Sequence, residues 1–356
     1  MRSVQEFSEK FLNQYIREEE TAQGAEDPSI DDDAYLDTFF PFQITWFINL
    51  NCNLRCPYCF LPEKSVSFEK PENEQIQKIA LALKKHEIFS VDILGGEPFL
   101  ESGKTVLAVQ ELKKNGISVR SISTNGTIFD EALVNELKKN PYHVLQVSVD
   151  APDPSTYEKV RAGKNFEKIA ENIERFVKSG LNVYLGFVIT KDNFEKIGEF
   201  FDFCEKLRVK GVSFGGFVPV GRGAGIKEKQ LSAEEAAKVY RKIKNRKTFL
   251  KVLMQSDISD GGCSGGMAYA VMMPNGDLYP CAMLIWCERL KIGNILEEKM
   301  SKENNAFFRK VNAFKFTSKC KDCSYPPICS KACKALLLQN YDSLDFQQKS
   351  GCPDED

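Results

Sequence analysis

The segment Asn51-Cys52-Asn53-Leu54-Arg55-Cys56-Pro57-Tyr58-Cys59-Phe60 carries three cysteines in the spacing C-x3-C-x2-C. It follows an apolar run, residues 43–50, that predicts a buried strand. Three thiolates on one short loop can hold three irons of a cubane iron–sulfur cluster and leave the fourth iron open. A zinc site is the alternative, but structural zinc sites need four ligands, and the nearest further candidate is His86. The spacing therefore favours an iron–sulfur cluster at the end of a strand.

Apolar strands and amphipathic helices alternate through the middle of the chain. The predicted strands cover residues 43–50, 90–94, 117–123, 144–149, 183–190 and 211–218, and the predicted helices cover residues 73–85, 101–114, 129–139, 166–178 and 193–207. A further helix over residues 233–244 and a strand over residues 249–254 are predicted to lead out of this region. Six such repeats predict an α/β fold with a parallel sheet covered by helices. Successive right-handed crossovers curl the sheet into a partial (β/α)6 TIM-like barrel. The cysteine loop then lies at the carboxyl ends of the strands, where such folds bind ligands.

Cysteine usage divides the chain further. There are 12 cysteines and only 2 histidines, which favours cluster ligation over disulfides or mixed Cys/His zinc sites. Eight cysteines fall between Cys263 and Cys352, in a segment too poor in apolar residues to form a large core of its own. We expect an N-terminal extension with an acidic linker over residues 1–41, the barrel over 42–255, and a small Cys-rich iron–sulfur domain over 256–356.

Composition excludes several classes of protein. Apolar residues make up 42% of the 356 residues, so the chain is globular. Lys plus Arg is 48 and Asp plus Glu is 50, which gives no basic footprint for nucleic acid or an anionic membrane. No apolar run approaches the roughly 18 residues of a membrane span, and the charged N-terminus has no signal-peptide core. We therefore predict a cytoplasmic protein.

The cysteine loop closely resembles the signature of the radical S-adenosylmethionine (radical SAM) superfamily, in which Tyr58 stands at the aromatic position. The resemblance implies a 4Fe–4S cluster held by Cys52, Cys56 and Cys59. Its open iron would chelate the amino and carboxylate groups of S-adenosylmethionine. One electron would then cleave this cofactor to methionine and a 5′-deoxyadenosyl radical, which abstracts a hydrogen from the substrate.

Polar residues after the next predicted strands agree with this family. Gly95-Gly96-Glu97-Pro98 matches the family's GGEP motif, in which glycines let the backbone approach a ligand and the glutamate accepts from a cationic amine. The fourth-strand element usually reads S-x-D-G in relatives, whereas Ala151 replaces that glycine here. A capping or loop role is the alternative for the residues after the third and fourth strands. The predicted cofactor-binding residues are Tyr58, Gly95, Gly96, Glu97, Thr124, Asn125, Ser148, Asp150 and Arg161.

The C-terminal cysteines resemble the SPASM extension of many radical SAM enzymes, which carries two auxiliary 4Fe–4S clusters. By this resemblance, the outer cluster is held by Cys320, Cys323, Cys329 and Cys352, and the inner cluster by Cys263, Cys281 and Cys333. The inner cluster either keeps an open iron or takes Cys287 as a fourth ligand. The remaining Cys204 is expected in the core, and the turn-rich residues 273–277 predict a hairpin.

Three functions remain open from the sequence. The first is modification of a ribosomally made peptide or protein, by crosslinking, thioether formation, epimerisation or oxidative decarboxylation, with flavodoxin or ferredoxin as the electron donor. The second is tailoring of a small molecule, such as decarboxylation of tetrapyrrole side chains. The third is a multi-cluster electron carrier. Sulfatase maturases have an Asp directly after the cysteine that corresponds to Cys281, and Ala282 at this position argues against formylglycine formation.

Overall fold

The computed structural model describes residues 41–61, 71–140, 143–254, 265, 269–285 and 288–297. Seven parallel strands form the main sheet: β1 (Gln43–Phe47), β2 (Ser90–Leu94), β3 (Ser118–Thr124), β4 (Val144–Ser148), β5 (Asn182–Ile189), β6 (Gly211–Gly216) and β7 (Lys251–Met254). The described α-helices are α3 (Asn73–Lys85), α4 (Ser102–Lys114), α5 (Glu131–Lys138), α6 (Pro154–Arg161), α7 (Phe166–Lys178), α8 (Ile197–Lys206) and α9 (Ala233–Lys244). The predicted βα repeat is therefore confirmed.

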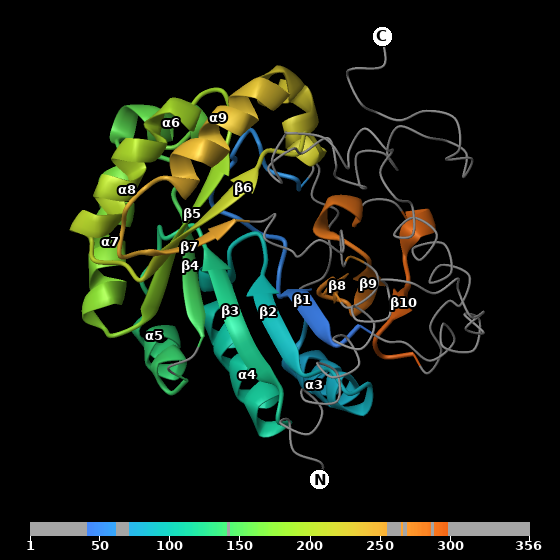
Figure 1. Cartoon of the computed structure of the whole chain (residues 1–356). Coiled ribbons are helices and arrows are strands. Elements are labelled where there is room, and N and C mark those ends of the chain that lie inside the picture. Colours follow the sequence, from blue (N-terminus) through green and yellow to red (C-terminus); the bar gives the residue numbers. More distant parts are fainter. Residues whose placement is uncertain are drawn as a thin grey trace, which may run out of the picture. The chain divides into compact units, whose positions relative to one another are not determined.

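The strands β1 to β7 lie side by side in chain order, with the helices along their outer side (Figure 1). A second set, β8 (Tyr269–Met272), β9 (Asp277–Tyr279) and β10 (Gly293–Asn294), extends the sheet on the other side of β1. Strand β8 runs parallel to β1, and β9 is antiparallel to β8. The predicted hairpin is thus confirmed, and its Gly276 has the positive φ of +92° that favours glycine. The pairing of β8 with β1 was not predicted.

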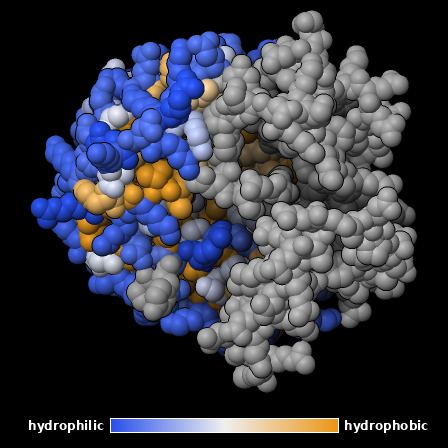
Figure 2. Space-filling view, in the orientation of Figure 1, coloured by the Kyte–Doolittle hydropathy of each residue, from blue (hydrophilic) through white to orange (hydrophobic). Residues whose placement is uncertain are grey.

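Apolar faces of the helices explain the packing. Helix α7 buries Ile169, Ile173 and Phe176, which share one face at helical spacing. The strands contribute fully buried residues such as Trp46 and Ile93 to the same core, and Cys204 of α8 is buried there as expected. The outer surface over the described helices is mostly hydrophilic (Figure 2). The core therefore lies between the sheet and its helical layer, and leaves the inner side of the sheet for a site.

Local capping explains the one helix that periodicity missed. Helix α6 begins where the Asp153 carboxylate accepts from the Thr156 N–H at 2.9 Å, with Pro154 in its first turn. It ends at Ala162, whose φ is +53°. Helix α8 begins later than predicted because Phe194–Lys196 form a 3-10 turn. No helix among the described residues is long and apolar enough to cross a bilayer.

Candidate active site

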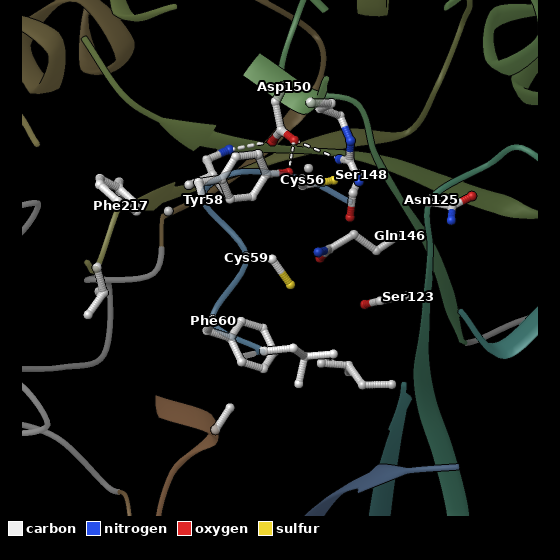
Figure 3. Close-up of a pocket in the computed structure, with 18 of the residues that line it drawn as sticks. Cys56, Tyr58, Cys59, Phe60, Ser123, Asn125, Gln146, Ser148, Asp150 and Phe217 are labelled. Atoms are coloured by element: carbon white, nitrogen blue, oxygen red, sulfur yellow. Dashed lines mark hydrogen bonds and ion pairs between the residues drawn. The ribbon is translucent and has the colours of Figure 1, made fainter. Parts of the chain in front are cut away.

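A cavity of about 560 Å³ opens at the carboxyl ends of the parallel strands. The loop after β1 lines it with Cys52, Cys56 and Cys59, and β2 to β7 each add at least one side chain or glycine. Figure 3 shows the Cys59 thiol pointing into this space, opposite Ser123 and Gln146. The arrangement brings residues from the whole length of the described barrel to one place, as parallel α/β folds do.

Hydrogen bonds from the segment after β6 hold the backbone of the cysteine loop. The Arg222 Nε donates to the Cys56 carbonyl at 3.1 Å, and the Gly223 N–H donates to the Cys59 carbonyl at 3.2 Å. A Cβ at Gly221 would lie 2.0 Å from the Phe60 carbonyl oxygen, so the segment after β6 packs directly on this loop. The segment that follows β6 therefore holds the loop that follows β1.

The three thiols suit a cluster better than a single metal ion. All three are free, Cys56 is buried, and Cys52 and Cys59 are half-buried. The Cys52 sulfur accepts from the Leu54 N–H at 3.4 Å. Burial raises the pKa of the Cys52 and Cys59 thiols, so ligation has to displace their protons. Among the described residues, no three His, Cys, Asp or Glu side chains lie close enough together to hold one metal ion. A cubane places its thiolates on different irons, so this donor set fits it.

The GGEP turn packs on the cysteine loop through its glycines. A Cβ at Gly96 would lie 2.2 Å from the Asn51 carbonyl oxygen, and one at Gly95 would lie 2.9 Å from that of Asn49. The Gly96 N–H donates to the Asn49 carbonyl, and the Glu97 N–H to the Asn51 carbonyl. The two glycines thus line the cavity and also allow this close packing, a requirement that the motif by itself did not reveal.

The Glu97 carboxylate is buried and partly satisfied within the protein. It accepts from the N–H groups of Phe99 at 2.9 Å and Asn125 at 2.6 Å, and from the Thr124 hydroxyl at 2.7 Å. Burial raises the pKa of Glu97, and these hydrogen bonds oppose the increase. An ionised carboxylate has about four lone-pair sites, so capacity for one further donor remains on the cavity side.

Of the predicted cofactor-binding residues near Glu97, some line the cavity and one holds the Glu97 carboxylate. Asn125 lines the cavity, and its amide donates to Asn53 at 2.8 Å and lies 3.8 Å from the Cys52 sulfur. Ser148 also lines the cavity. Thr124 does not, because its hydroxyl donates to Glu97 and accepts from the Gly126 N–H at 3.1 Å. Thr124 therefore holds the carboxylate in place.

A buried ionic cluster supports the cysteine loop at the end of β4. The Asp150 carboxylate accepts from Arg161 at 2.6 Å, from the Val188 N–H at 2.6 Å and from the Tyr58 hydroxyl (Figure 3). Asp150 has a φ of +62°, and its side chain is 1% exposed. The side chains of Tyr58, Asp150 and Arg161 all border the cavity. This cluster ties the cysteine loop to β4, α6 and β5, which gives Asp150 a scaffolding role whatever else it contacts.

Several predicted ligands lie outside the described residues, namely Cys263, Cys320, Cys323, Cys329, Cys333 and Cys352, and so does Cys287. Cys281 is described and half-buried, and its sulfur accepts from the Met283 N–H at 3.4 Å at the start of a 3-10 turn. The adjoining Ala282 and Met283 line the same cavity. This part of the C-terminal region therefore borders the site.

Sequence reasoning missed Ser123, Gln146 and Ser213 in the cavity wall. Gln146 lies two residues before Ser148, between the buried Leu145 and Val147. Residues two positions apart in a strand lie on the same face of the sheet, so Gln146 and Ser148 face the same side. This period-two signal was present in the sequence and identifies Gln146 once Ser148 is known to face inward.

Comparison with known proteins agrees with this site. Residues 47–204 match the family model described as the radical SAM superfamily. This part of the chain is a radical SAM domain. A radical SAM domain implies a 4Fe–4S cluster and S-adenosylmethionine as cofactors, and it indicates an enzyme. The matched region runs from the cysteine loop to α8 and so includes most of the barrel.

Relatives of this radical SAM enzyme have several activities. It is 31% identical to an Fe-coproporphyrin III synthase of Methanosarcina barkeri over 54% of this chain, which spans about half (48%) of that relative. It is 24% identical to the mycofactocin maturase MftC of Mycolicibacterium smegmatis, with 83% of this chain and 78% of the relative covered. An AdoMet-dependent heme synthase of Nitratidesulfovibrio vulgaris is 23% identical, with 82% and 87% covered.

Solved structures share the fold. SuiB of Streptococcus suis, in a crystal structure with its precursor peptide SuiA, has a TM-score of 0.72 at 20% identity, with 98% of this chain and 89% of that chain covered. The protein anSMEcpe with bound AdoMet has a TM-score of 0.68 at 20% identity, with 86% and 92% covered. The fold shared with these structures thus extends beyond the residues of the family match.

Proposed function

We propose that this radical SAM enzyme modifies a residue of a ribosomally made peptide or protein. The observation that carries the proposal is a single cavity that contains the three cysteines of the loop and a wall of apolar and uncharged polar side chains. Among the relatives, MftC is named a maturase, and SuiB was crystallised with a precursor peptide. The class of reaction is crosslinking, thioether formation, epimerisation or oxidative decarboxylation.

In this proposal, Cys52, Cys56 and Cys59 hold the 4Fe–4S cluster. When bound, the cluster and S-adenosylmethionine supply a 5′-deoxyadenosyl radical for hydrogen abstraction. The remaining acceptor site of Glu97 would receive the cofactor's ammonium group, because a charge-assisted hydrogen bond is strong in a buried site. Ser148 and Asn125 would contact the cofactor from neighbouring strand ends, and the packed Gly95-Gly96 backbone would fix the distance between cofactor and loop.

Tyr58, Asp150 and Arg161 would keep the loop in register with β4 and β5. Asp150 uses both of its carboxylate oxygens for contacts within the protein, so its part is to orient Tyr58 and Arg161. Arg161 keeps its Nε without a partner in the part of the chain that the structure describes. We therefore assign a direct cofactor contact to Arg161 and a positioning role to Asp150, while the hydroxyl of Tyr58 is held by Asp150 and its ring borders the cavity.

The C-terminal cysteines would form a SPASM-type domain with two auxiliary 4Fe–4S clusters. The position of Cys281 next to cavity-lining residues supports an inner cluster close to the substrate. A flavodoxin or ferredoxin would be the electron donor. A second substrate class is a tetrapyrrole with side-chain carboxylates, because two of the relatives are an Fe-coproporphyrin III synthase and a heme synthase.

Metal content and cofactor cleavage test the proposal together. Anaerobically purified protein is expected to contain about 12 irons, as three cubanes, and to form 5′-deoxyadenosine after reduction with dithionite. Changing Cys52, Cys56 and Cys59 together to alanine should remove about a third of the iron and all cofactor cleavage. Cys204→Ala is the matched control, since this buried cysteine lies in the core and should leave iron unchanged. Zinc in place of iron in the wild type would refute the proposal.

A further inference from the structure

The inner wall of the barrel carries polar side chains that the cofactor site does not use. Ser123 of β3, Gln146 of β4 and Ser213 of β6 all line the cavity. None of their side chains has a hydrogen-bond partner in the part of the chain that the structure describes. Unpartnered donors and acceptors on a cavity wall commonly mark ligand contacts, because a polar group removed from water needs a partner.

The strand register places these polar side chains close to Gly186, which adds no side chain to the wall. Ser123 pairs with Gln146 across β3 and β4, and Gly186 of β5 pairs with Ser213 of β6. A Cβ at Gly186 would lie 3.3 Å from the Gln146 Nε2. The glutamine amide therefore lies over the glycine, and reaches from β4 toward β6. Figure 3 shows Ser123 and Gln146 facing the same space as Ser148.

The wall formed by the strands is uncharged. The cavity-lining residues within β2 to β8 are Leu94, Ser123, Gln146, Ser148, Gly186, Phe187, Val188, Ser213, Phe214, Gly215, Gly216, Leu253, Met254 and Tyr269. The charged residues of the cavity come from the cysteine loop and from segments that follow strands. Glu97, Asp150 and Arg222 already bond within the protein. On the strand wall itself a substrate carboxylate would meet no opposite charge to compensate its desolvation, because the cavity cations Arg55 and Arg161 lie on the cysteine loop and at the end of α6.

We propose that Gln146, with Ser123 and Ser213, binds an uncharged amide group of the substrate and so selects a peptide backbone or side-chain amide over a carboxylate. An amide offers a donor and an acceptor, and the glutamine carboxamide complements both. Gly215 and Gly216 of β6 add no side chain to this wall, which leaves room there for a substrate backbone to approach. This inference rests on the proposed function, and it decides between the two substrate classes in favour of the peptide.

The test uses anaerobic holoenzyme loaded with S-adenosylmethionine and kept without reductant. The probes are N-acetylglycine N-methylamide, an uncharged peptide unit, and propionate, observed by saturation-transfer NMR. We expect the diamide to bind and propionate not to bind. Gln146→Leu should weaken diamide binding about tenfold, the loss expected for one or two hydrogen bonds. Gln110→Leu removes the same amide from α4, outside the cavity, where it donates to Glu136 at 2.9 Å, and should bind the diamide like the wild type.

Other results overturn the inference. They are propionate binding as tight as that of the diamide, wild-type diamide affinity in Gln146→Leu, or loss of S-adenosylmethionine binding in that variant, which would assign the amide to the cofactor. Gln146→Glu keeps the side-chain shape and adds a charge, so it should also lose the diamide, and it serves if the leucine variant does not fold. Failure of the proposed function has a separate signature, because the wild type would then form no 5′-deoxyadenosine on reduction.

Discussion

Replacing Gly96 by alanine tests whether the GGEP turn positions the cysteine loop. The added Cβ would lie 2.2 Å from the carbonyl oxygen of Asn51, 2.4 Å from its carbonyl carbon and 2.6 Å from the Leu50 oxygen. Real Cβ atoms essentially never approach another heavy atom within 3.0 Å. All three neighbours are backbone atoms, so no change of rotamer can relieve the contact.

The consequence can be scaled from these distances. The loop must retreat by about 1 Å, and a displacement of this size at a reacting centre lowers rates by roughly 10²-fold. Overpacking of this kind also costs about 1–3 kcal/mol of stability. The retreat breaks the hydrogen bond from the Glu97 N–H to the Asn51 carbonyl, now 2.6 Å long. Because Asn51 directly precedes Cys52, we expect the cluster ligands to move with it.

The assay compares iron content, apparent Tm and 5′-deoxyadenosine formation in anaerobically purified variants. Gly96→Ala should lose iron from the loop cluster and nearly all cofactor cleavage. Gly103→Ala is the control, because no atom lies within 4 Å of its added Cβ in α4. That variant should equal the wild type or gain up to about 1 kcal/mol of stability from helix propensity. Wild-type iron content and cleavage in Gly96→Ala would refute the reasoning.

Three further predictions concern single side chains. Glu97→Gln should weaken S-adenosylmethionine binding, because charge-assisted hydrogen bonds are about twice as strong as neutral ones; equal affinities by calorimetry would contradict the assignment. Arg161→Met leaves the Asp150 carboxylate, 1% exposed, without its cation, and should cost about 3–5 kcal/mol. In the same denaturation assay Lys178→Met, which breaks an exposed pair, should cost under about 1 kcal/mol. His143 is 2% exposed, and burial lowers its pKa from 6.5 to about 4. The unfolded chain therefore takes up the proton first as pH falls, so up to about 3 kcal/mol of stability should be present above pH 6.5 and be lost toward pH 4. His143→Leu should remove this pH dependence of the free energy of unfolding. If the variant and the wild type lost the same stability between pH 6.5 and pH 4, the His143 ring would be accessible to protons in the folded protein.

Much of the fold follows from local sequence. Apolar runs and amphipathic periods set the order of strands and helices, since each element must bury its apolar face, and parallel strands with helical crossovers then have few possible arrangements. The spacing of Cys52, Cys56 and Cys59 identified the loop because its chemistry depends on residues adjacent in the chain. Helix α6 was missed because an eight-residue helix is specified by its Asp153 cap more than by its periodicity.

The tertiary structure alone decided which polar residues are free to act. Thr124 and Ser123 are neighbours in sequence, yet the Thr124 hydroxyl is bonded to Glu97 and the Ser123 hydroxyl faces the cavity. Asp150 matched a cofactor motif, but its carboxylate is occupied by partners from other elements. The pairing of β8 with β1 likewise joins segments more than 200 residues apart. A sequence lists donors and acceptors, but only the folded chain shows which of them satisfy one another and which remain for a ligand.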